Sequence, residues 1–513
     1  MFKILSYLSI LFFISTQLLA DGTQPAGSGT ETDPYQVETL DNLLWMSTNT
    51  ISWDKYFTQN TDIDASATQN WNNGEGFSPI GIDSDDPFTG SYYGKEHLIT
   101  GLHIVLPDND CIGFFGCTDG AAISHLGLEN IDVTGYQGVG GLVGWNDNSE
   151  ILNCYVTGNL LGEQEVGGLV GYNHFSTITH SHTIINIIGN GNNAVGGLVG
   201  FNNDASTISN CYSVSNLSGN DDIGGIVGMN IYSTIQNCYS ECTITGHDCL
   251  GGLVGDCYES SISNSYSNGN TIEGNSKVGG LVGINISCPI INCYSTSSIV
   301  GNANVGGLIG YISYPDVQNS FWDIETSGQA TSEGGTGKTT AEMQNVATYT
   351  SLVTVGLDEP WDFVGNPYDD TGNEDYWNID ENFNNGYPFF ANPFVGIDDE
   401  MINNNSQIAK LFGNYPNPFH PSTTISFSLT AENAKNAEIV IYNLKGQKVK
   451  TLIASPNQSS LHYATVNGGL RTRDSVTWDG TDENNKSVSS GIYFYELNVN
   501  GKTEALKECV FLK

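Results

Sequence analysis

A hexapeptide close to VGGLVG recurs seven times through the middle of the chain at a nearly constant spacing. Successive copies lie 27 to 29 residues apart, and they begin at Val139, Val166, Val195, Ile223, Leu250, Val278 and Val305. A fixed period of this length is typical of repeat architectures, in which a unit buries its apolar face only when neighbouring units stack on it. The spacing therefore predicts a solenoid with one coil per period.

Each period holds two further short segments. An Asn-Cys-Tyr or Asn-Ser-Tyr element begins about fourteen residues after each hexapeptide begins, as at residues 153–155 and 210–212, and one copy reads His180-Ser181-His182. A weaker element has an aliphatic residue shortly before a glycine, as at Ile244. Segments rich in Val, Ile, Thr, Tyr and Cys, separated by Gly, Asn and Ser, favour strands over helices. We therefore predict an all-β fold, a parallel β-solenoid (β-helix) with coils about 4.8 Å apart.

The pattern predicts the inside and outside of a coil only in part. The glycine pair is expected at a bend where two backbones approach closely. Equivalent residues are expected in ladders along the axis, with inward columns of Cys or Tyr. Because Gly and Asn can mark bends between sides, either face of residues 208–212 is compatible with the interior.

A degenerate copy of the repeat precedes the first clear one. Residues 111–116 (CIGFFG) lie 28 residues before Val139, which gives eight coils over residues 111–322. We predict that residues 21–110 form an N-terminal leader and cap, with an amphipathic segment at residues 39–49 over the first coil. Residues 323–397 are predicted to close the other end, because an open end exposes strand edges.

The hexapeptide followed by NCYS resembles the GLUG-motif repeats of bacterial surface proteins. The resemblance covers residues 111–322. Upstream, FTGSYYGKEHLITGLHI (88–104) is similar to the leader of such solenoids, and FWDIETSGQATSEGGTGKTTAEM (321–343) is similar to the segment that closes them. The resemblance implies an exported surface protein with a GLUG-type β-solenoid.

The last hundred residues form a different module, in which short alternating strands separated by Gly, Asn and Pro predict a small Ig-like β-sandwich. Residues 411–513 closely resemble the type A C-terminal sorting domain of the type IX secretion system, through YPNPF (415–419), YNLKG (442–446), WDG (478–480) and SGIY (490–493). Cys509 departs from the apolar residue that is usual there. The resemblance implies the type IX secretion machinery as partner, and residues 398–410 are expected to be an accessible linker.

The N-terminus and the charge indicate where the protein works. Residues 1–20 fit a secretory signal peptide, with Lys3 before an uncharged run, and no later apolar run is long enough to cross a bilayer. We therefore expect no transmembrane segment in the mature protein, which would be extracellular or on the bacterial surface. The formal net charge is −40, with four lysines against 47 acidic residues between residues 21 and 409. Such a body repels phosphate backbones, so we expect no nucleic acid partner.

Candidate chemistry is sparse. The 11 cysteines lie mostly at repeat positions and form no CxxC pair or zinc spacing. The sequence GGTGKT (334–339) resembles a phosphate loop, but Ser332 replaces its first glycine. GLUG repeats also accompany zinc metallopeptidase domains, yet the chain has no HExxH, and we interpret His180 and His182 as ladder residues. We assign no catalytic, cofactor-binding or metal-binding residue and expect no cofactor.

The sequence is compatible with two functions. The first is a non-enzymatic protein for adhesion or polymer binding, whose partners are glycans or surface polymers held by the loops at residues 146–150, 202–206 and 258–261. The alternative is a polysaccharide hydrolase or lyase on the same scaffold. A lyase commonly needs a basic residue, and the body has no arginine. Hydrolysis would need paired acids, for which the candidates are Asp83, Asp85, Asp86, Asp221, Asp222 and Asp256.

Overall fold

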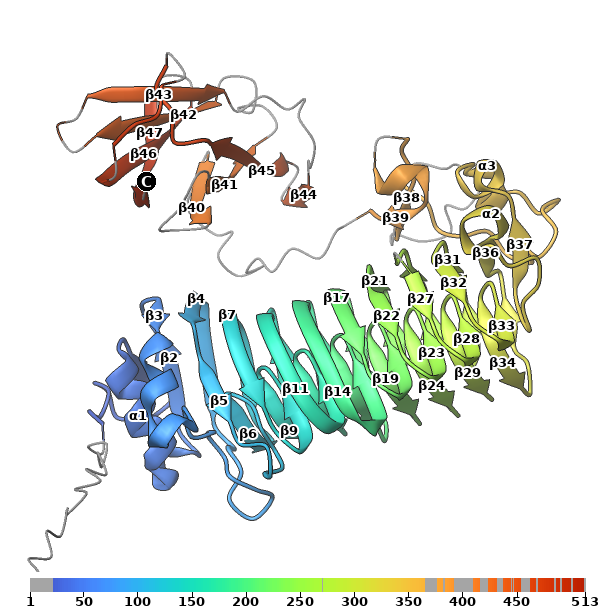
Figure 1. The fold of residues 1–513 in the computed structure, drawn as a ribbon, viewed down its shortest axis with the longest axis horizontal. Helices are drawn as coiled ribbons and strands as arrows, with labels where there is room; N and C mark the ends of the chain where they lie inside the picture. Colours follow the sequence, from blue (N-terminus) through green and yellow to red (C-terminus); the bar gives the residue numbers. More distant parts are fainter. Residues whose placement is uncertain are drawn as a thin grey trace, which may run out of the picture. The chain divides into compact units, whose positions relative to one another are not determined.

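In the computed structural model the chain forms two compact units, residues 1–389 and 390–513 (Figure 1). The described residues are 22–269, 271–364, 376–381, 383–391 and, from 409 to 511, the strands with part of their connecting turns. The predicted signal peptide lies outside them, as does the predicted linker except for Ala409 and Lys410.

The first unit is a parallel β-solenoid, as the repeat predicts. Strands of consecutive coils pair in parallel and place equivalent residues opposite one another, for example Tyr212 opposite Tyr239 and Ile223 opposite Leu250. One side of the stack is an eight-stranded sheet, which confirms the degenerate first copy (Figure 1). Its strands are β6 (Phe115–Asp119), β9 (Val143–Asp147), β12 (Val170–His174), β15 (Val199–Asn203), β19 (Val227–Ile231), β24 (Val254–Tyr258), β29 (Val282–Ile286) and β34 (Ile309–Ser313).

The other sides belong to one continuous sheet, because several strands run around a corner without a break. Such long strands in the repeats are β7 (Ala122–Thr134), β11 (Tyr155–Gly167), β14 (His182–Gly196) and the shorter β17 (Tyr212–Ser218). The hexapeptide side has β8 (Gln137–Gly140), β18 (Asp221–Gly224), β23 (Asp248–Gly251), β28 (Ser276–Gly279) and β33 (Ala303–Gly306). The side before the Asn corner has β10 (Glu150–Leu152), β13 (Thr177–Thr179), β16 (Thr207–Ser209), β20 (Thr234–Gln236), β25 (Ser261–Ser263), β30 (Ile290–Ile291) and β35 (Val317–Gln318). After that corner, later coils have β21 (Tyr239–Ser240), β22 (Thr243–Thr245), β26 (Tyr266–Ser267), β27 (Thr271–Glu273), β31 (Tyr294–Ser295), β32 (Ser298–Val300) and β36 (Phe321–Asp323).

A coil therefore contains more strands than the three segments expected from the sequence. The coil that begins at Asp221 has five, β18 to β22, because corners interrupt it. Tyr232 and Asn237 make two of these corners with φ of 51° and 52°. At the glycine pair, a Cβ on Gly224 would lie 2.0 Å from the Val227 carbonyl oxygen, and one on Gly225 would lie 2.1 Å from that of Gly252. The pair is thus required by close backbone packing, as expected.

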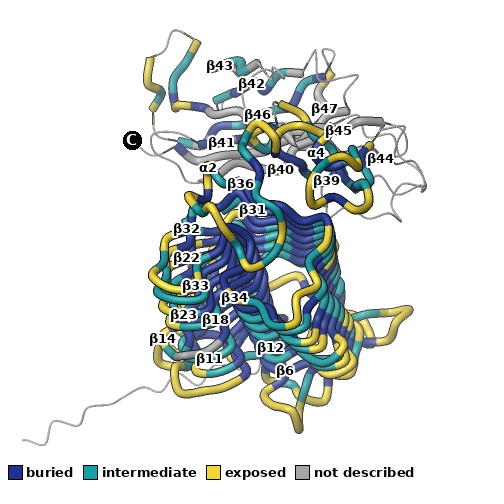
Figure 2. The backbone as a smooth tube through the Cα atoms, turned by 90° about the vertical axis from the view of Figure 1, so that its right-hand side faces the viewer, coloured by how far each residue is buried: buried dark blue, intermediate teal, exposed yellow. Residues whose placement is uncertain are grey.

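The corner at Asn210 decides the inward face that the sequence left open. Asn210 has φ of 56°, so the alternation restarts there: Ile208 and Cys211 are both buried and Tyr212 points outward. Buried residues line the inside of every coil (Figure 2). The ten cysteines whose side chains the structure describes, all except Cys509, are buried and unpaired by disulfides.

The leader adds parallel strands to the sheet of the solenoid. Its strands β1 (Tyr35–Val37), β2 (Tyr56–Gln59) and β4 (Ser91–Thr100) pair in parallel in that order, and β4 pairs with β7. Two short strands, β3 (Ile63–Asp64) and β5 (His103–Val105), also join this sheet. The predicted amphipathic segment is helix α1 (Leu40–Thr48), which begins with a capping box between Thr39 and Asn42 and buries Leu43 and Met46.

The closing segment covers the last coil with short elements and large aromatic side chains. Strand β37 (Thr336–Lys338) pairs with β36, and the helices α2 (Ile324–Ser327), α3 (Thr340–Met343) and α4 (Ala347–Thr350) lie around it. Two short strands, β38 (Trp377–Asn378) and β39 (Phe389–Phe390), form a further pair. Trp361 and Trp377 are fully buried, with their ring centres 4.7 Å apart.

The second unit is a β-sandwich, as predicted. Its two antiparallel four-stranded sheets share a core that includes Ile425, Trp478, Ile439 and Tyr495. One sheet contains β40 (Ala409–Tyr415), β41 (Thr423–Thr430), β44 (His462–Val466) and β45 (Gly469–Trp478). The other contains β42 (Ala437–Asn443), β43 (Lys448–Ile453), β46 (Gly491–Val499) and β47 (Lys502–Phe511).

Candidate functional site

The repeat places equivalent outward side chains in columns along the axis, so a functional feature must be sought where a column gathers aromatic or charged residues. One column contains Tyr155, His182, Tyr212, Tyr239, Tyr266 and Tyr294. Neighbouring rings lie 4.5 to 5.0 Å apart and within 7° of parallel. Each ring face is therefore covered by the next ring. At the end of the column Tyr266 and Tyr294 are buried against Trp377, so only the earlier rings have edges near the surface.

The eight-stranded sheet carries a second aromatic row with a different geometry. Trp145, Tyr172 and Phe201 follow the last glycine of three successive hexapeptides and are half-buried on the outer face of β9, β12 and β15. Their ring centres are 4.7 and 5.2 Å apart, and the planes cross at 62° and 85°. Because the rings meet edge to face, they do not cover one another as the stacked column does.

Charged groups lie beside this row. The His174 Nδ1 atom is 2.8 Å from the Asp147 carboxylate on the preceding coil, and its Nε2 atom is 3.3 Å from the Asp204 carboxylate on the following coil. The Phe175 ring centre lies 4.2 Å from that of His174, and the Phe175 side chain is half-exposed. We call Trp145, Tyr172, Phe201 and the neighbouring His174 with its two aspartates the aromatic face.

A separate acidic cluster lies farther along the solenoid. Asp222 and Asp256 are half-buried on adjacent coils, and a Cβ on Gly255 would meet the Asp222 backbone at 2.6 Å. Burial, and then the negative charge of Asp256, raise the pKa of Asp222 to about 7; burial also raises the pKa of Asp256. Lys277 partly opposes both shifts, and its Nζ atom lies 4.0 Å from the Cys249 sulfur. Among the candidate acids, Asp222 and Asp256 are thus partly desolvated, whereas Asp83, Asp85 and Asp86 are exposed.

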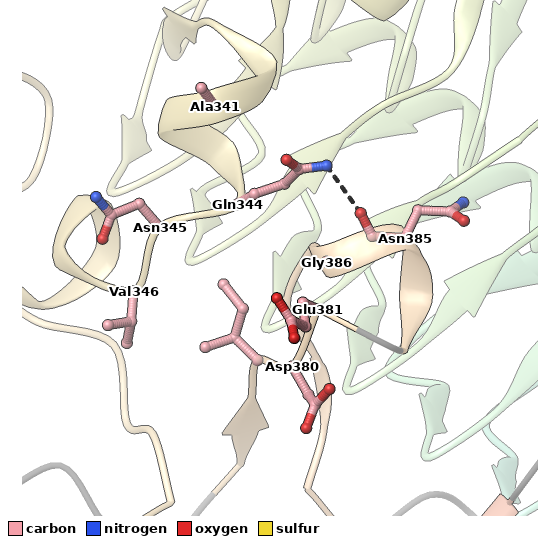
Figure 3. A pocket seen from close by; sticks show the side chains of 9 residues that line it. Ala341, Gln344, Asn345, Val346, Asp380, Glu381, Asn385 and Gly386 are labelled. Carbon is pink, nitrogen blue, oxygen red and sulfur yellow. Dashed lines mark hydrogen bonds between the residues drawn. The ribbon is translucent and has the colours of Figure 1, made fainter. Parts of the chain in front are cut away.

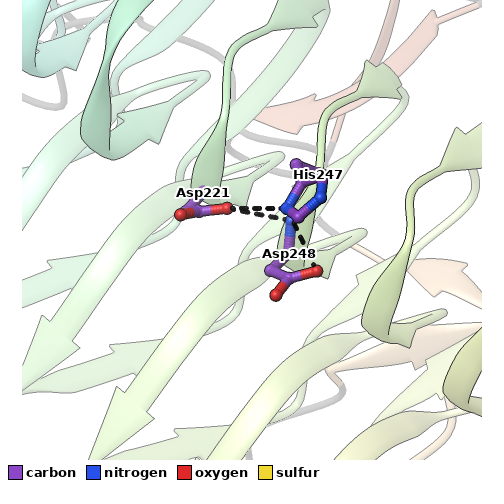
Figure 4. Close-up of side chains that lie close together, drawn as sticks. All are labelled: Asp221, His247 and Asp248. Atoms are coloured by element: carbon purple, nitrogen blue, oxygen red, sulfur yellow. Dashed lines mark hydrogen bonds and ion pairs between the residues drawn. The ribbon is translucent and has the colours of Figure 1, made fainter.

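Three further side chains converge next to this cluster (Figure 4). One oxygen each of Asp221 and Asp248 and the His247 Nδ1 atom all lie within 4.8 Å of one another. Asp221 and Asp248 are opposite each other on β18 and β23, and His247 immediately precedes β23. Carboxylate and imidazole groups at this separation are a possible ligand set for a divalent cation.

The closing segment contains a pocket of about 630 Å³ (Figure 3). Asp380, Glu381 and the amides of Gln344, Asn345 and Asn385 contribute to its wall, and Gln344 donates a hydrogen bond of 2.8 Å to the Asn385 carbonyl oxygen. None of its lining residues is aromatic. The pocket is therefore chemically distinct from the aromatic face.

The segments that suggested chemistry in the sequence have packing or turn-forming roles in the fold. In the sequence that resembles a phosphate loop, Lys338 is buried, donates to the Val355 carbonyl oxygen at 2.9 Å and lies over the Phe321 ring. His182 stacks in the tyrosine column, while His180 forms a corner with φ of 51°. Asp83 accepts hydrogen bonds from the backbone of Asp85 and Asp86 in an exposed turn.

The loops proposed for binding are only partly available. Asn146 and Ser149 of the first loop, Asn202 and Ser206 of the second and Ser260 of the third are buried, so these side chains are not available to hold a ligand. The aromatic face was not predicted from the sequence, although its signal is present. A ring follows the hexapeptide in three successive copies, at Trp145, Tyr172 and Phe201, and again only in the last copy, at Tyr311.

Comparison with known proteins agrees with the two modules. Residues 135–160 and 191–218 match the GLUG motif, and residues 414–470 match the secretion system C-terminal sorting domain. The chain combines GLUG repeats with a type IX sorting domain. It is also 37% identical over 141 residues to Halomucin of Haloquadratum walsbyi; the match covers 26% of this chain and only 2% of Halomucin.

The sorting domain places the protein outside the cell or on its surface and implies contact with the secretion machinery. In the described strands, its landmark residues have structural roles: Trp478 is buried in the core, and Tyr493 donates to the Ser489 carbonyl oxygen at 2.7 Å. Residues 416–419, part of the YPNPF motif, lie outside the described residues. No helix among the described residues is long and apolar enough to span a membrane.

Proposed function

We propose that this exported protein binds a polysaccharide or similar surface polymer through the aromatic face and does not cleave it. The observation that carries the proposal is the edge-to-face row of Trp145, Tyr172 and Phe201 on an otherwise regular sheet. Ring faces that are left partly uncovered can pack against the C–H groups of a sugar ring, whereas the parallel tyrosine column has its faces filled.

The charge of the surface favours a neutral polymer. Asp147 and Asp204 flank the row, and Asp119 lies on the preceding strand β6, where it accepts a hydrogen bond from the exposed Asn148. Such a surface repels polyuronates and sulfated polymers. A polymer that follows the solenoid axis would meet one ring per coil, so weak contacts would add along its length.

A binding panel tests this proposal. The full chain is assayed for retention on insoluble or immobilised neutral, uronate-containing and sulfated polysaccharides, and the polymer is examined for new reducing or unsaturated ends. We expect retention on at least one neutral polymer without new ends, and a loss of at least tenfold in affinity in Trp145→Ala combined with Tyr172→Ala. Ile184→Ala with Ile188→Ala, which removes two half-exposed side chains from another side, is the matched control. Unchanged retention in the aromatic variant would contradict the proposal.

The acidic pair supports a second candidate function, hydrolysis of a glycan. Asp222 and Asp256 are adjacent half-buried carboxylates, the type of pair that cleaves glycosidic bonds. In that case the same panel would reveal new reducing ends, and both Asp222→Asn and Asp256→Asn would abolish their release while retention on the aromatic face persists.

A further inference from the structure

We propose that Asp221, His247 and Asp248 bind one divalent transition-metal ion, of the Zn²⁺ type, on the outer surface of the solenoid. This site is independent of the polymer-binding proposal, because none of its residues belongs to the aromatic face. The chemical argument is the mixed donor set: an imidazole nitrogen with two carboxylate oxygens suits zinc and its neighbours in the first transition row better than Ca²⁺ or Mg²⁺, which prefer oxygen ligands throughout.

The geometry of His247 differs from that of an ordinary ion pair. Its Nδ1 atom lies 3.3 Å from the Asp248 oxygen and 3.7 Å from the Asp221 oxygen, both longer than a good N–H···O hydrogen bond. One nitrogen therefore faces both carboxylates without bonding closely to either. Ligands about 2.0 to 2.2 Å from a common ion are separated by distances close to these, so small side-chain movements would complete the coordination.

His174 provides an internal comparison, since it also lies between two aspartates. Its two carboxylate partners contact opposite ring nitrogens, and the Nδ1 distance of 2.8 Å is that of a hydrogen bond. The two carboxylates therefore do not converge on one ring nitrogen, and His174 is not part of the converging group found among the described residues. The converging arrangement is therefore specific to the position of His247 and does not occur at every histidine that has acidic neighbours.

The scaffold holds the three ligands in place. The Asp248 backbone N–H donates to the Asp221 carboxylate at 3.0 Å, and the Asn275 side chain donates to the Asp248 carboxylate at 3.2 Å. Backbone hydrogen bonds of 2.6 Å join His247 to Asn220 on one neighbouring coil and to Asn275 on the other. Such supporting contacts orient metal ligands and limit the entropy lost on binding. The side chain of His247 is about 60% exposed, which leaves room for water ligands.

The repeat also supplies a conservative variant. Asn220, Asn275 and Asn302 occupy the position of His247 in neighbouring coils, as the hydrogen bonds between successive coils show. His247→Asn therefore restores the residue that the column otherwise has, and it should fold like the parent chain. His174→Asn is the matched control, because it removes a histidine flanked by two aspartates whose geometry does not converge.

The experiment measures Zn²⁺ binding to the metal-stripped full chain, without a polyhistidine tag, by calorimetry and by equilibrium dialysis. We expect one site that His247→Asn and Asp248→Asn each weaken at least tenfold and that His174→Asn leaves unchanged. Zn²⁺ should raise the melting temperature of the parent chain but not that of His247→Asn, and Ca²⁺ should compete at least tenfold less well. Equal binding by His247→Asn, or a site for which Ca²⁺ competes as well as Zn²⁺, would overturn the proposal.

Discussion

The Asn146 side-chain amide donates to the Asn173 side-chain oxygen at 2.8 Å, across the gap between two consecutive coils, and both side chains are fully buried. Asn173 repeats this bond to Asn202, and Asn202 to Asn230, each at 2.8 Å. The row satisfies polar groups that would otherwise be costly inside the solenoid, and it fixes the register of one coil on the next.

The buried amide row predicts that truncating one of its side chains strongly lowers the stability of the solenoid. Asn202→Ala removes two hydrogen bonds and leaves partners on both neighbouring coils unsatisfied, so we expect the free energy of unfolding to fall by about 2 to 3 kcal/mol. Asn186→Ala is the control, because it also interrupts an amide row, but on the exposed surface. Its cost should stay below about 0.5 kcal/mol in urea unfolding. Equal losses of unfolding free energy in Asn202→Ala and Asn186→Ala would contradict a special contribution from the buried row.

The left-handed backbone conformation at the Asn237 corner predicts that stability depends on which residue occupies this position. Its φ of 52° is unfavourable for residues with a Cβ, although Asn tolerates it better than most, and its side chain donates to Asn210 at 3.2 Å. Asn237→Ala should cost about 1 to 2 kcal/mol, whereas Asn237→Gly keeps the backbone conformation and should cost less than half of that. Denaturant midpoints of the two variants measure the difference, and the reverse order would contradict a role for the corner conformation.

Glu165 predicts a pH-dependent stability. Burial, more than the opposing hydrogen bond from Gln137, raises the pKa of Glu165 above its ordinary value of 4.5. The folded state therefore favours the protonated carboxyl; this contribution is complete below about pH 4.5 and is lost as the pH rises through the folded-state pKa. Glu165→Gln should be more stable than the parent chain at pH 7.5, by less than about 1 kcal/mol because solvent screens the charge, and no more stable at pH 4.

Melting temperatures of both proteins at the two pH values measure this effect. Glu150→Gln, an exposed change at the start of β10, controls for the loss of one negative charge. A gain for Glu165→Gln that is the same at both pH values would contradict the assignment to ionisation.

The repeat was sufficient to predict the solenoid, its eight coils and the bend at the glycine pair, because the same spacing governs local geometry and stacking. The inward face was not predictable, because the turn at Asn210 shifts the alternation and brings Ile208 and Cys211 to the same side. The alternation of inward and outward side chains along a strand does not reveal such a shift unless the left-handed residue at the corner is identified first.

The candidate sites were harder to predict for a related reason. Asp221, His247 and Asp248 are separated by up to 27 positions, and only the stacking register brings their side chains together. Trp145, Tyr172 and Phe201 occupy one repeat position, but whether their rings stack in parallel or cross depends on packing that the sequence does not specify.

The C-terminal unit has its own core and its own pair of sheets. Because the solenoid is closed by the aromatic residues of its own last segment, a chain ending at residue 409 should still fold but should no longer reach the medium. Cell fractionation should find this truncated protein in the periplasm, and a reporter with a signal peptide and residues 411–513 should be secreted. Trp478→Ala, which empties the core of the sorting domain, should reduce secretion at least several-fold, with Ile184→Ala as the solenoid control. Secretion of the truncated chain at the level of the parent would contradict the role of this unit.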